Sequence, residues 1–384
     1  MPLRVALLFG GPSPERGISL NSARSVADHL EGPGLVLEAL VYFDGRRRPF
    51  RVTRPLLYSN TPDDFDFKLS LTSSPLDDAQ LTAVLRGCDL AFPVMHGSFG
   101  EDGGVQSILE AAGVPFVGSS AAACATAYDK ARCLEHLTAA GIPTVPWAVV
   151  APGAGRDEVE AAIAAVDGGG PIVSKPAAGG SSIGVQAYPD ARAAVAGVEA
   201  AVARYGRVVV EPWVDGIELT TVVVEGPDGP VALPPVEVEL RRRSPLDILS
   251  YRYKYLPSDD TRYHCPPRLD PATVAHVRAT AETAFAALAL ADFARIDGWL
   301  RPDGGVVVSD VNPISGMEQN SFLFIQAAQA GMSHRDALRL VVSRAAGRAG
   351  LDLPEAEWSA PAAAADREPV LILFGGATAE RQVS

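Results

Sequence analysis

Lysine is scarce in this chain of 384 residues. Only four of the 33 basic residues are lysine, so arginine supplies nearly all of the positive charge. Three of the four, Lys130, Lys175 and Lys254, stand in segments rich in glycine, tyrosine or acidic turn residues. Because an ammonium is a compact point charge that suits phosphate oxygens, these three lysines are candidates for phosphate binding. For any one of them alone, chance is an equally good explanation.

Positive charge is also in deficit overall, with a net charge of −13 and a pI near 5.0. A protein whose main partner is nucleic acid or an anionic membrane needs a basic face, so neither partner is expected here. The apolar run at 5–9 is too short for a signal peptide and far too short to span a bilayer. We therefore expect a cytoplasmic protein with no nucleic acid or membrane partner.

Cysteine occurs four times, with no CxxC spacing and no histidine at the spacing of a zinc site. The pattern predicts reduced, mostly buried thiols at Cys88, Cys124, Cys133 and Cys265. With 47% hydrophobic residues, the chain is long enough for two or three packed domains and a large core.

Short apolar runs alternate with helical patterns, which predicts the α/β class. In the first third, strands are expected at 5–9, 35–43, 90–93 and 115–117, and helices at 18–30, 104–112 and 122–140. We divide the chain into a Rossmann-like parallel-sheet domain (1–120), a central subdomain with a glycine loop (121–208), a C-terminal subdomain (209–350), a linker (351–369) and a terminal segment (370–384).

The terminal segment repeats the start of the chain. Residues 370–384 match residues 5–19 at eight of fifteen positions with an offset of 365, and keep Gly-Gly and Glu-Arg in register after an apolar run. Chance is a poor explanation for such a match. Our hypothesis is that this chain is the first unit of a tandem protein, and that a second, similar unit begins at 370.

A glycine-rich loop at 175–184 follows an apolar strand and contains Lys175, Ser181 and Ser182. Its backbone is flexible enough to lay N–H groups over phosphate oxygens, and the two hydroxyls add donors. The lysine precedes the glycines, so the loop is not a Walker A motif. Taken alone, the loop is equally well explained as the turn of a β-hairpin.

Two polar strands, with a turn at 303–305 between them, carry Arg295, Asp297, Asp310 and Asn312. Strand alternation places the first two on a common face and the last two on a common face. Two carboxylates and an amide are hard oxygen ligands that suit Mg²⁺ beside nucleotide phosphates, and a guanidinium stabilises negative charge on a substrate oxygen. The alternative is a surface hairpin with outward polar residues.

Two further segments suit a nucleotide or an anion. The strand end at 211–214, with Glu218 shortly after it, fits a hinge that holds an adenine through backbone groups and a ribose through a carboxylate. It fits the end of a core strand equally well. The loop at 96–104 begins at His96 and leads into a helix start, where anions bind. By itself, His96 is better explained as a hydrogen-bonded loop histidine.

These segments, in this order, resemble the ATP-grasp superfamily and specifically the D-alanine:D-alanine ligase family. The resemblance runs from Leu3 to Ala346. Within that span it includes three further segments, 10–22, 254–255 and 316–317. It implies an ATP-grasp fold after the Rossmann-like domain, with a lid and the metal site in the C-terminal subdomain. It also implies a ligase that uses ATP and Mg²⁺, with Mn²⁺ as an alternative metal, to form a carbon–nitrogen bond through an acyl phosphate.

The resemblance implies a role for each site residue. ATP would be bound by Lys130, Lys175, Ser182, Glu211, Trp213, Val214, Glu218 and Lys254, and the metal by Asp297, Asp310 and Asn312. Glu15 would anchor the ammonium of the first amino acid, Ser181 and Tyr255 would link the phosphate loop and lid to Glu15, and Arg295 with the Gly316 backbone would form the oxyanion site. The substrate pocket would include His96, Glu318, Ser321 and Phe322, with Ser321 on the carboxylate of the second substrate.

The sequence departs from the family at the pocket for the attacking amino acid. Residues 313–322, Pro-Ile-Ser-Gly-Met-Glu-Gln-Asn-Ser-Phe, stand in place of the usual Thr-Ser-Pro-Gly-Met-Thr-Ser-His-Ser-Leu. Asp310 replaces a glutamate, and Gly179 and Arg252 replace acidic residues. Because Glu318 adds a carboxylate and Phe322 adds bulk, we expect a nucleophile other than D-alanine, in a specialised pathway.

Three functions remain open on the sequence. The first is a ligase that joins small amino acid or peptide substrates into a dipeptide or similar amide. The second is a catalytically silent nucleotide-binding unit that docks or regulates a second fused ligase-like unit, and the third is a kinase that stops at phosphoryl transfer. The metal set, Arg295 and Lys175 favour an enzyme, and Ser321 and Tyr255 favour ligation. The resemblance also implies a homodimer.

Overall fold

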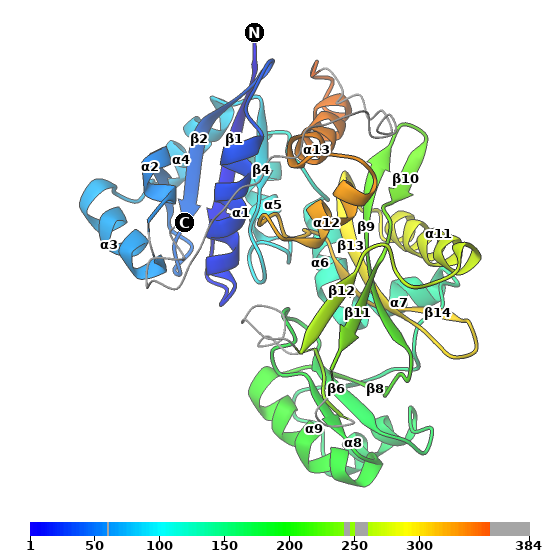
Figure 1. Ribbon diagram of the computed structural model, residues 1–384. Helices are drawn as coiled ribbons and strands as arrows, with labels where there is room; N and C mark the ends of the chain where they lie inside the picture. Colours follow the sequence, from blue (N-terminus) through cyan, green and yellow to red (C-terminus); the bar gives the residue numbers. More distant parts are fainter. Residues whose placement is uncertain (60, 242–245, 250–259, 354–384) are drawn as a thin grey trace, which may run out of the picture.

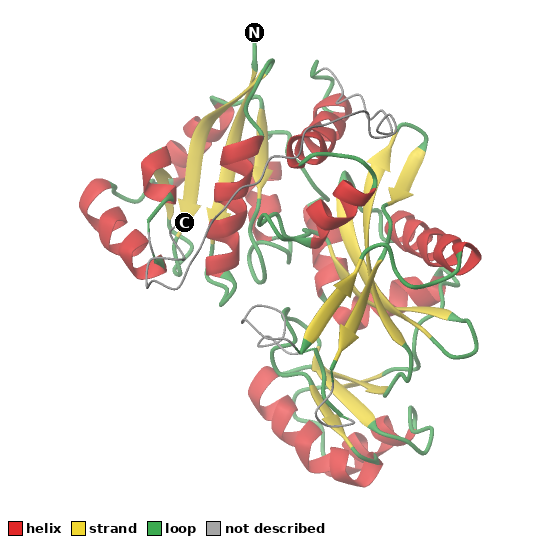
Figure 2. Ribbon diagram, in the orientation of Figure 1, coloured by secondary structure: helices red, strands yellow, loops and turns green. Residues whose placement is uncertain are grey.

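Three β-sheets with helices against their faces make up the structure, a computed structural model that describes residues 1–59, 61–241, 246–249 and 260–353 (Figures 1 and 2). Helices and strands alternate along the chain, so the predicted α/β class is confirmed. The sheets lie in three regions, an N-terminal one, a central one and a C-terminal one (Figure 1).

The N-terminal sheet has the strand order β3-β2-β1-β4. Strand β1 (Leu3–Gly10) is parallel to β2 (Leu35–Phe43) and β4 (Leu90–Pro93), and β3 (Pro49–Val52) adds an antiparallel edge. Alternate side chains of β1 point to opposite faces, one covered by α1 and α3 and the other by α4 and α5. The helices of this region are α1 (Arg16–His29), α2 (Arg54–Leu57), α3 (Pro62–Thr72), α4 (Asp78–Arg86) and α5 (Gly104–Ala112).

The strand predicted at 115–117 is wrong. Only an isolated bridge joins Phe116 to Ala91, through the Pro115 carbonyl and the Val117 N–H. Pro115 has no N–H to donate, and Gly118 turns the chain with a φ of 103°. The segment therefore touches the sheet at one residue and then leaves it.

The central region is an antiparallel sheet with the order β5-β8-β6-β7 and two helices packed on it. Its elements are β5 (Ala148–Val150), α8 (Arg156–Ala164), β6 (Ile172–Pro176), β7 (Gln186–Tyr188), α9 (Ala191–Tyr205) and β8 (Val208–Pro212). The glycine loop at 177–185 joins β6 to β7, which pair antiparallel, so the loop does close a hairpin.

Two helices replace the single one predicted at 122–140. Helix α6 (Ala121–Tyr128) stops before Asp129, whose extended backbone starts α7 (Lys130–Ala139) and whose carboxylate accepts the Arg132 N–H at 3.1 Å. Asp129 also bridges to Ala178 of the glycine loop. The break places Lys130 at the start of a helix and directly beside that loop.

The C-terminal sheet has the order β12-β11-β9-β13-β14, with β10 paired to β9. Its strands are β9 (Ile217–Gly226), β10 (Gly229–Ala232), β11 (Val236–Leu240), β12 (Thr261–His264), β13 (Phe293–Leu300) and β14 (Val306–Asn312). The helices are α11 (Pro271–Ala287), α12 (Phe322–Gln329) and α13 (His334–Arg348). Helix α11 packs in one cluster with β13 and β14, whereas α12 and α13 pack with β9 and the N-terminal sheet.

A buried ion pair ties the N-terminal and C-terminal regions together. Asp292, just before β13, is fully buried, accepts the Gly118 N–H at 2.6 Å and pairs with Arg348 at the end of α13. One hydrophobic cluster also runs from β1 and α1 to α13 and β9. The two regions therefore share a core, and the N-terminal loops are held against the C-terminal sheet.

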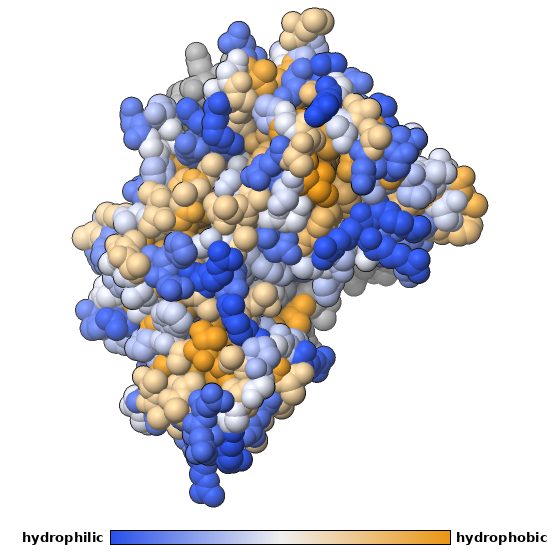
Figure 3. All heavy atoms as spheres, turned by 180° about the vertical axis from the view of Figure 1, so that it is seen from behind, coloured by the Kyte–Doolittle hydropathy of each residue, from blue (hydrophilic) through white to orange (hydrophobic). Residues whose placement is uncertain are grey.

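The surface and the thiols agree with the composition. Seen from behind, hydrophilic areas in blue are interspersed with apolar areas in tan and orange (Figure 3). Within the described ranges, no helix has the length and apolar character needed to cross a membrane. The four cysteines are free thiols, and Cys88, Cys124 and Cys133 are buried, as predicted.

Candidate active site

Two cavities meet at the point where the three regions converge. One, of about 410 Å³, lies between the central and C-terminal sheets, and the other, of about 580 Å³, lies between the N-terminal domain and the C-terminal sheet. Both are lined by Gly180, Glu218 and Asp297. The two cavities are therefore adjacent and share part of their lining.

Lys130 and Lys175 both line the first cavity. Lys175 Nζ lies 2.5 Å from Glu211 Oε2, and both side chains are largely buried. Burial lowers the pKa of Lys175, but Glu211, with smaller effects from Asp310 and Glu218, more than offsets this, so the pKa of Lys175 is raised. The other oxygen of Glu211, Oε1, is buried without a hydrogen-bond partner among the described residues. Lys130 Nζ donates to the Gly179 carbonyl at 2.7 Å and lies 3.4 Å from Asp310.

The predicted hinge borders the same cavity, which is lined by Trp213, Val214 and Glu218. Trp213 N–H donates to the Pro171 carbonyl at 2.8 Å, so it holds the strand end in place and is not open to a ligand. At the strand end predicted to hold an adenine through backbone groups, the Trp213 N–H is therefore already used. The Val214 N–H and the Trp213 carbonyl remain candidates for that contact.

The glycine loop forms the wall between the cavities. Ser181 and Ser182 have φ values of 52° and 58°, a left-handed conformation that costs energy for residues with a side chain. It turns consecutive hydroxyls to opposite sides. Ser181 Oγ donates to Glu15 in the second cavity, and Ser182 Oγ donates to the Leu249 carbonyl at 2.7 Å in the first.

The polar hairpin of β13 and β14 brings four predicted residues onto one face. Asp297 lies opposite Asp310, and Arg295 lies opposite Asn312. Residues directly opposite on antiparallel strands share a face, as do residues two apart, so all four side chains lie together. Arg295 Nη2 lies 2.9 Å from Asp297, and Asn312 Nδ2 donates to Asp297 at 3.0 Å.

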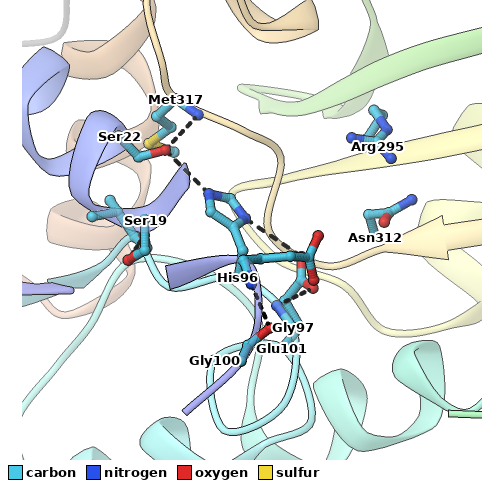
Figure 4. A network of polar contacts seen from close by, with 12 residues as sticks. Ser19, Ser22, His96, Gly97, Gly100, Glu101, Arg295, Asn312 and Met317 are labelled. Atoms are coloured by element: carbon cyan, nitrogen blue, oxygen red, sulfur yellow. Dashed lines mark hydrogen bonds and ion pairs between the residues drawn. The ribbon is translucent and has the colours of Figure 1, made fainter. Parts of the chain in front are cut away.

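A buried network surrounds His96 at the base of the second cavity (Figure 4). Its Nε2 lies 3.1 Å from Ser22 Oγ, and its Nδ1 lies 3.7 Å from Glu101 Oε1. Gly97 packs against Glu15, because a Cβ there would lie 2.7 Å from Glu15 Oε2, and its φ of 73° also favours glycine. The loop thus delivers His96 and Glu101 to the same place as Glu15 at the start of α1.

Carboxylates control the charge of His96. Burial favours the neutral ring, but Glu101, Glu318 and Glu15 favour the imidazolium, and the net effect raises the pKa of His96.

We expect Glu101→Gln to lower the pKa of His96, because burial remains and the nearest negative charge is lost. NMR titration of the ring proton measures it, with exposed His276 as internal reference and Asp102→Asn as control. An unchanged His96 titration would contradict this role of Glu101.

The segment 316–322 closes the second cavity. Glu318 Oε2 accepts from Ser22 Oγ at 3.3 Å and folds back over Gly316. Ser321 is buried, and its Oγ has no hydrogen-bond partner among the described residues. Phe322 packs edge-on against Tyr263 at 5.1 Å and lies under the Arg295 guanidinium at 5.7 Å. The segment supplies a carboxylate, a hydroxyl and an aromatic ring to one pocket.

Some predicted residues cannot be placed, and some residues of the site were not predicted. Lys254, Tyr255 and Arg252 lie outside the described residues, as does 370–384. Side chains that the sequence did not single out but that contact or line the site are Ser22, Arg24, Glu101, Thr220, Glu237, Tyr263 and Arg268. Of these, only Ser22 and Glu101 lie in segments that the sequence pointed to, 10–22 and 96–104. Thr220 could not be found from local sequence, because it reaches Asp297 through the pairing of β9 with β13.

Comparison with known proteins identifies the family. A family model described as D-ala D-ala ligase N-terminus matches residues 4–119, and a second, described as D-ala D-ala ligase C-terminus, matches residues 136–343. The chain belongs to the D-alanine–D-alanine ligase family. As a member, it is an ATP-dependent ligase that forms a carbon–nitrogen bond, and the family typically uses Mg²⁺.

Individual relatives of this ligase match over almost its whole length. The D-alanine–D-alanine ligase of Cupriavidus necator is 33% identical over 356 residues, covering 92% of this chain and 94% of the relative. That of Stutzerimonas stutzeri is 33% identical over 340 residues, covering 88% and 92%. Among solved structures, the VanG D-Ala:D-Ser ligase from Enterococcus faecalis has a TM-score of 0.77 at 25% identity, covering 90% of this chain and all of that one. The predicted ATP-grasp fold is thereby confirmed.

Proposed function

We propose that this ligase phosphorylates the carboxylate of one amino acid with ATP and joins it to the amine of a second substrate that is not D-alanine. The observation that carries the proposal is the meeting of the two cavities at Gly180, Glu218 and Asp297. One cavity has two lysines for phosphates, and the other has Glu15 and Ser321 for amino acid groups. A phosphoryl group passes between them without entering solvent.

The nucleotide cavity suits ATP in the type and placement of its groups. Lys130, Lys175 and Ser182 would hold phosphates, Glu218 the ribose, and the 211–214 strand end the adenine, with the buried Glu211 Oε1 as an available acceptor. Lys254 would add a phosphate contact from the lid. The role of Trp213 is then to position Val214 through its bond to Pro171.

The hairpin residues also fit a divalent cation. Asp297, Asp310 and Asn312 share one face and offer two carboxylates and an amide oxygen, which are the hard ligands that Mg²⁺ or Mn²⁺ takes. A cation bound there would neutralise charge on the phosphates. Asp310 has one methylene less than a glutamate but keeps the charge, so metal binding is expected to survive.

The remaining roles follow the family resemblance, and the charge and position of the described residues support them. Glu15, held by Ser181, would bind the ammonium of the first amino acid, and Tyr255 would complete that link from the lid. Arg295 and the Gly316 N–H would stabilise the oxygen of the acyl phosphate. The second amine then attacks the acyl carbon, the amide bond forms, the carbon–oxygen bond to phosphate breaks, and phosphate leaves while the amine loses its proton.

The second-substrate pocket supports a different nucleophile. The buried Ser321 Oγ without a partner suits a substrate carboxylate, whereas Glu318 and the Phe322–Tyr263 pair reshape the space beside it. VanG, similar in fold, is named a D-Ala:D-Ser ligase, so a second substrate other than D-alanine occurs on this architecture.

The first experiment incubates the full chain with ATP, Mg²⁺ and either D-alanine or pooled amino acids, and follows ADP release and product mass. We expect ADP and an amide only when amino acids other than D-alanine are supplied. A D-alanine dipeptide would show that the pocket changes are neutral. A phosphorylated product without an amide would indicate a kinase, and absence of ADP release would favour the silent docking unit.

Replacing Glu318 by threonine is expected to shift the nucleophile preference toward D-alanine, because the side chain no longer places a charge over Gly316. The measurement is the ratio of kcat/KM values for the preferred nucleophile and D-alanine. The control is Gln319→Ser in the same segment, an exposed position. An unchanged ratio in the Glu318 variant would remove Glu318 from substrate selection.

Domain boundaries and assembly complete the proposal. The proposed boundary at 120 follows the N-terminal sheet and the end of the first family model at 119. The proposed boundary at 208 falls at the first residue of β8, which pairs with β5 and β6 of the central sheet, so a boundary after 212 fits the sheets better. A homodimer, and a second fused ligase-like unit from 370 after a linker at 351–369, remain proposals; size-exclusion chromatography with light scattering tests the former.

A further inference from the structure

Arg24 lines the substrate cavity from helix α1. Its Nε donates to the Leu57 carbonyl, its Nη1 to Asn21 Oδ1 at 3.0 Å and its Nη2 to the Ser59 carbonyl at 2.7 Å. A guanidinium has five N–H donors, so one N–H on each terminal nitrogen has no protein acceptor among the described residues. These two can bind a carboxylate through two parallel hydrogen bonds.

Among the described residues, no carboxylate forms an ion pair with Arg24. Neighbouring arginines have carboxylate partners: Arg16 pairs with Asp66 at 2.8 Å, and Arg54 pairs with Glu31. Arg24 has no such ion pair within the described part of the chain, and its acceptors are neutral. It is about half-buried, and burial lowers its pKa. A partly desolvated cation without an anionic partner, on the wall of a substrate cavity, favours an anionic ligand.

The position of Arg24 on α1 indicates which part of a bound substrate would contact it. Gly17, Asn21 and Arg24 all line the cavity and are spaced four and three residues apart, so they share one face of the helix. That face leads away from Glu15, and nine residues correspond to about 14 Å along the axis. Helical side chains lean toward the N-terminus, which brings Arg24 back toward the cavity. Arg24 therefore lies farther along α1 than Glu15, on the wall of the same cavity.

The other charged groups for which contacts are known lie close to the reaction centre. Glu318 accepts from Ser22, which also contacts His96, and Arg295 pairs with Asp297. These groups surround the site where the amide forms. Arg24 therefore supplies a cation that those acids do not neutralise.

We propose that Arg24, oriented by Asn21, is a carboxylate subsite, and that the second substrate carries an acidic group farther from its reacting amine than the carboxylate of alanine. This inference rests on the proposed function and specifies its second substrate. Two kinds of substrate carry a carboxylate at that distance: an acidic amino acid, through its side chain, and a dipeptide, through its terminal carboxylate. We favour the acidic amino acid because a single residue fills less space.

Binding to the full chain tests the subsite independently of turnover. Calorimetry with ADP and Mg²⁺ compares glutamate with glutamine, each as both enantiomers, because the pair differs only in the charged group. We expect one enantiomer of glutamate to bind about tenfold more tightly than its glutamine counterpart, the effect of a charge-assisted hydrogen bond. Arg24→Met should abolish that preference, and Arg24→Lys should retain part of it.

Arg54→Met is the matched control. Arg54 also joins α1 and α2, through the Ala27 carbonyl and Glu31, but it does not line the cavity. If Arg24 were only a link between helices, the two variants would behave alike. Circular dichroism verifies folding, and Arg24→Gln provides a second neutral variant if methionine is not tolerated.

The outcomes separate the inference from the function on which it rests. Equal binding of glutamate and glutamine by the wild type, together with no preference between a dipeptide and its C-terminal amide, overturns the subsite. A preference that persists in Arg24→Met overturns the assignment to Arg24. A dipeptide preference lost in Arg24→Met supports the subsite and identifies a peptide as the source. Failure to release ADP with any amino acid counts against the proposed function alone.

Discussion

Replacing Arg295 by methionine is expected to lower kcat by about 10²- to 10³-fold, the usual effect of removing one group that stabilises transition-state charge. The guanidinium is held by Asp297 at 2.9 Å and by the ring of Phe322, and it lines the substrate cavity. Methionine retains much of the side-chain volume but cannot stabilise the oxygens of an acyl phosphate. ADP release at saturating substrates measures kcat, and calorimetry measures ATP binding.

A neighbouring arginine provides the control for Arg295. Arg301 belongs to the same hairpin, pairs with Asp303 at 2.9 Å in an exposed position and lines neither cavity. Arg301→Met is therefore expected to leave kcat nearly unchanged. Because the proposed loss affects the reaction step, ATP binding should change much less than kcat in Arg295→Met. A kcat close to that of the wild type would exclude Arg295 from the oxyanion site.

Replacing Arg348 by methionine is expected to lower the free energy of unfolding by about 3 kcal/mol, the low end for a broken buried ion pair. Its partner Asp292 is fully buried, whereas the Arg348 side chain is 42% exposed. This exposure reduces the loss of stability expected from removing Arg348. The pair joins the end of α13 to Gly118 and to the start of β13. Urea unfolding measures the change, and Arg4→Met, which breaks an exposed pair with Asp89, should have little effect.

The loss in Arg348→Met should also depend on pH. Burial raises the pKa of Asp292 above its ordinary value of 3.8, while Arg348 lowers it, so the variant raises that pKa further. An acid whose folded-state pKa is raised stabilises the fold below its unfolded pKa and loses that contribution as pH rises through the folded pKa. The variant should therefore lose more stability near pH 8 than near pH 5. Asp292→Asn in the same background should remove the difference, and its persistence would contradict this explanation.

The parts of the site that depend on strand periodicity could be predicted from the sequence. A strand has a side-chain period of two, so Arg295 with Asp297, and Asp310 with Asn312, had to share faces once the segments were recognised as strands. The glycine loop was likewise visible, because glycine clusters mark backbone that adopts positive φ. Where a local signal was overridden, a single residue was responsible: Asp129 divides the helix expected at 122–140, and Pro115 limits the strand expected at 115–117 to one bridge.

Contacts between distant segments were decided by tertiary structure. Ser181 reaches Glu15 across 166 positions, and Glu318 reaches Ser22 across 296. No periodicity encodes such pairs, because they depend on how separate sheets pack. The position of Arg24 in the substrate cavity has the same origin, since an arginine on a helix is normally part of a solvated face.

By itself, the sequence determined the family, the α/β class and the kinds of chemical group available for phosphate, metal and amino acid substrates, because residue types and their local spacing set these. Only the tertiary structure decided which of those groups share a cavity, that the glycine loop separates two cavities, and that a half-buried arginine without an acidic partner among the described residues faces one of them. Packing of the N-terminal domain against the C-terminal sheet brings these groups together, and that packing depends on the shared core and on buried pairs such as Asp292 with Arg348.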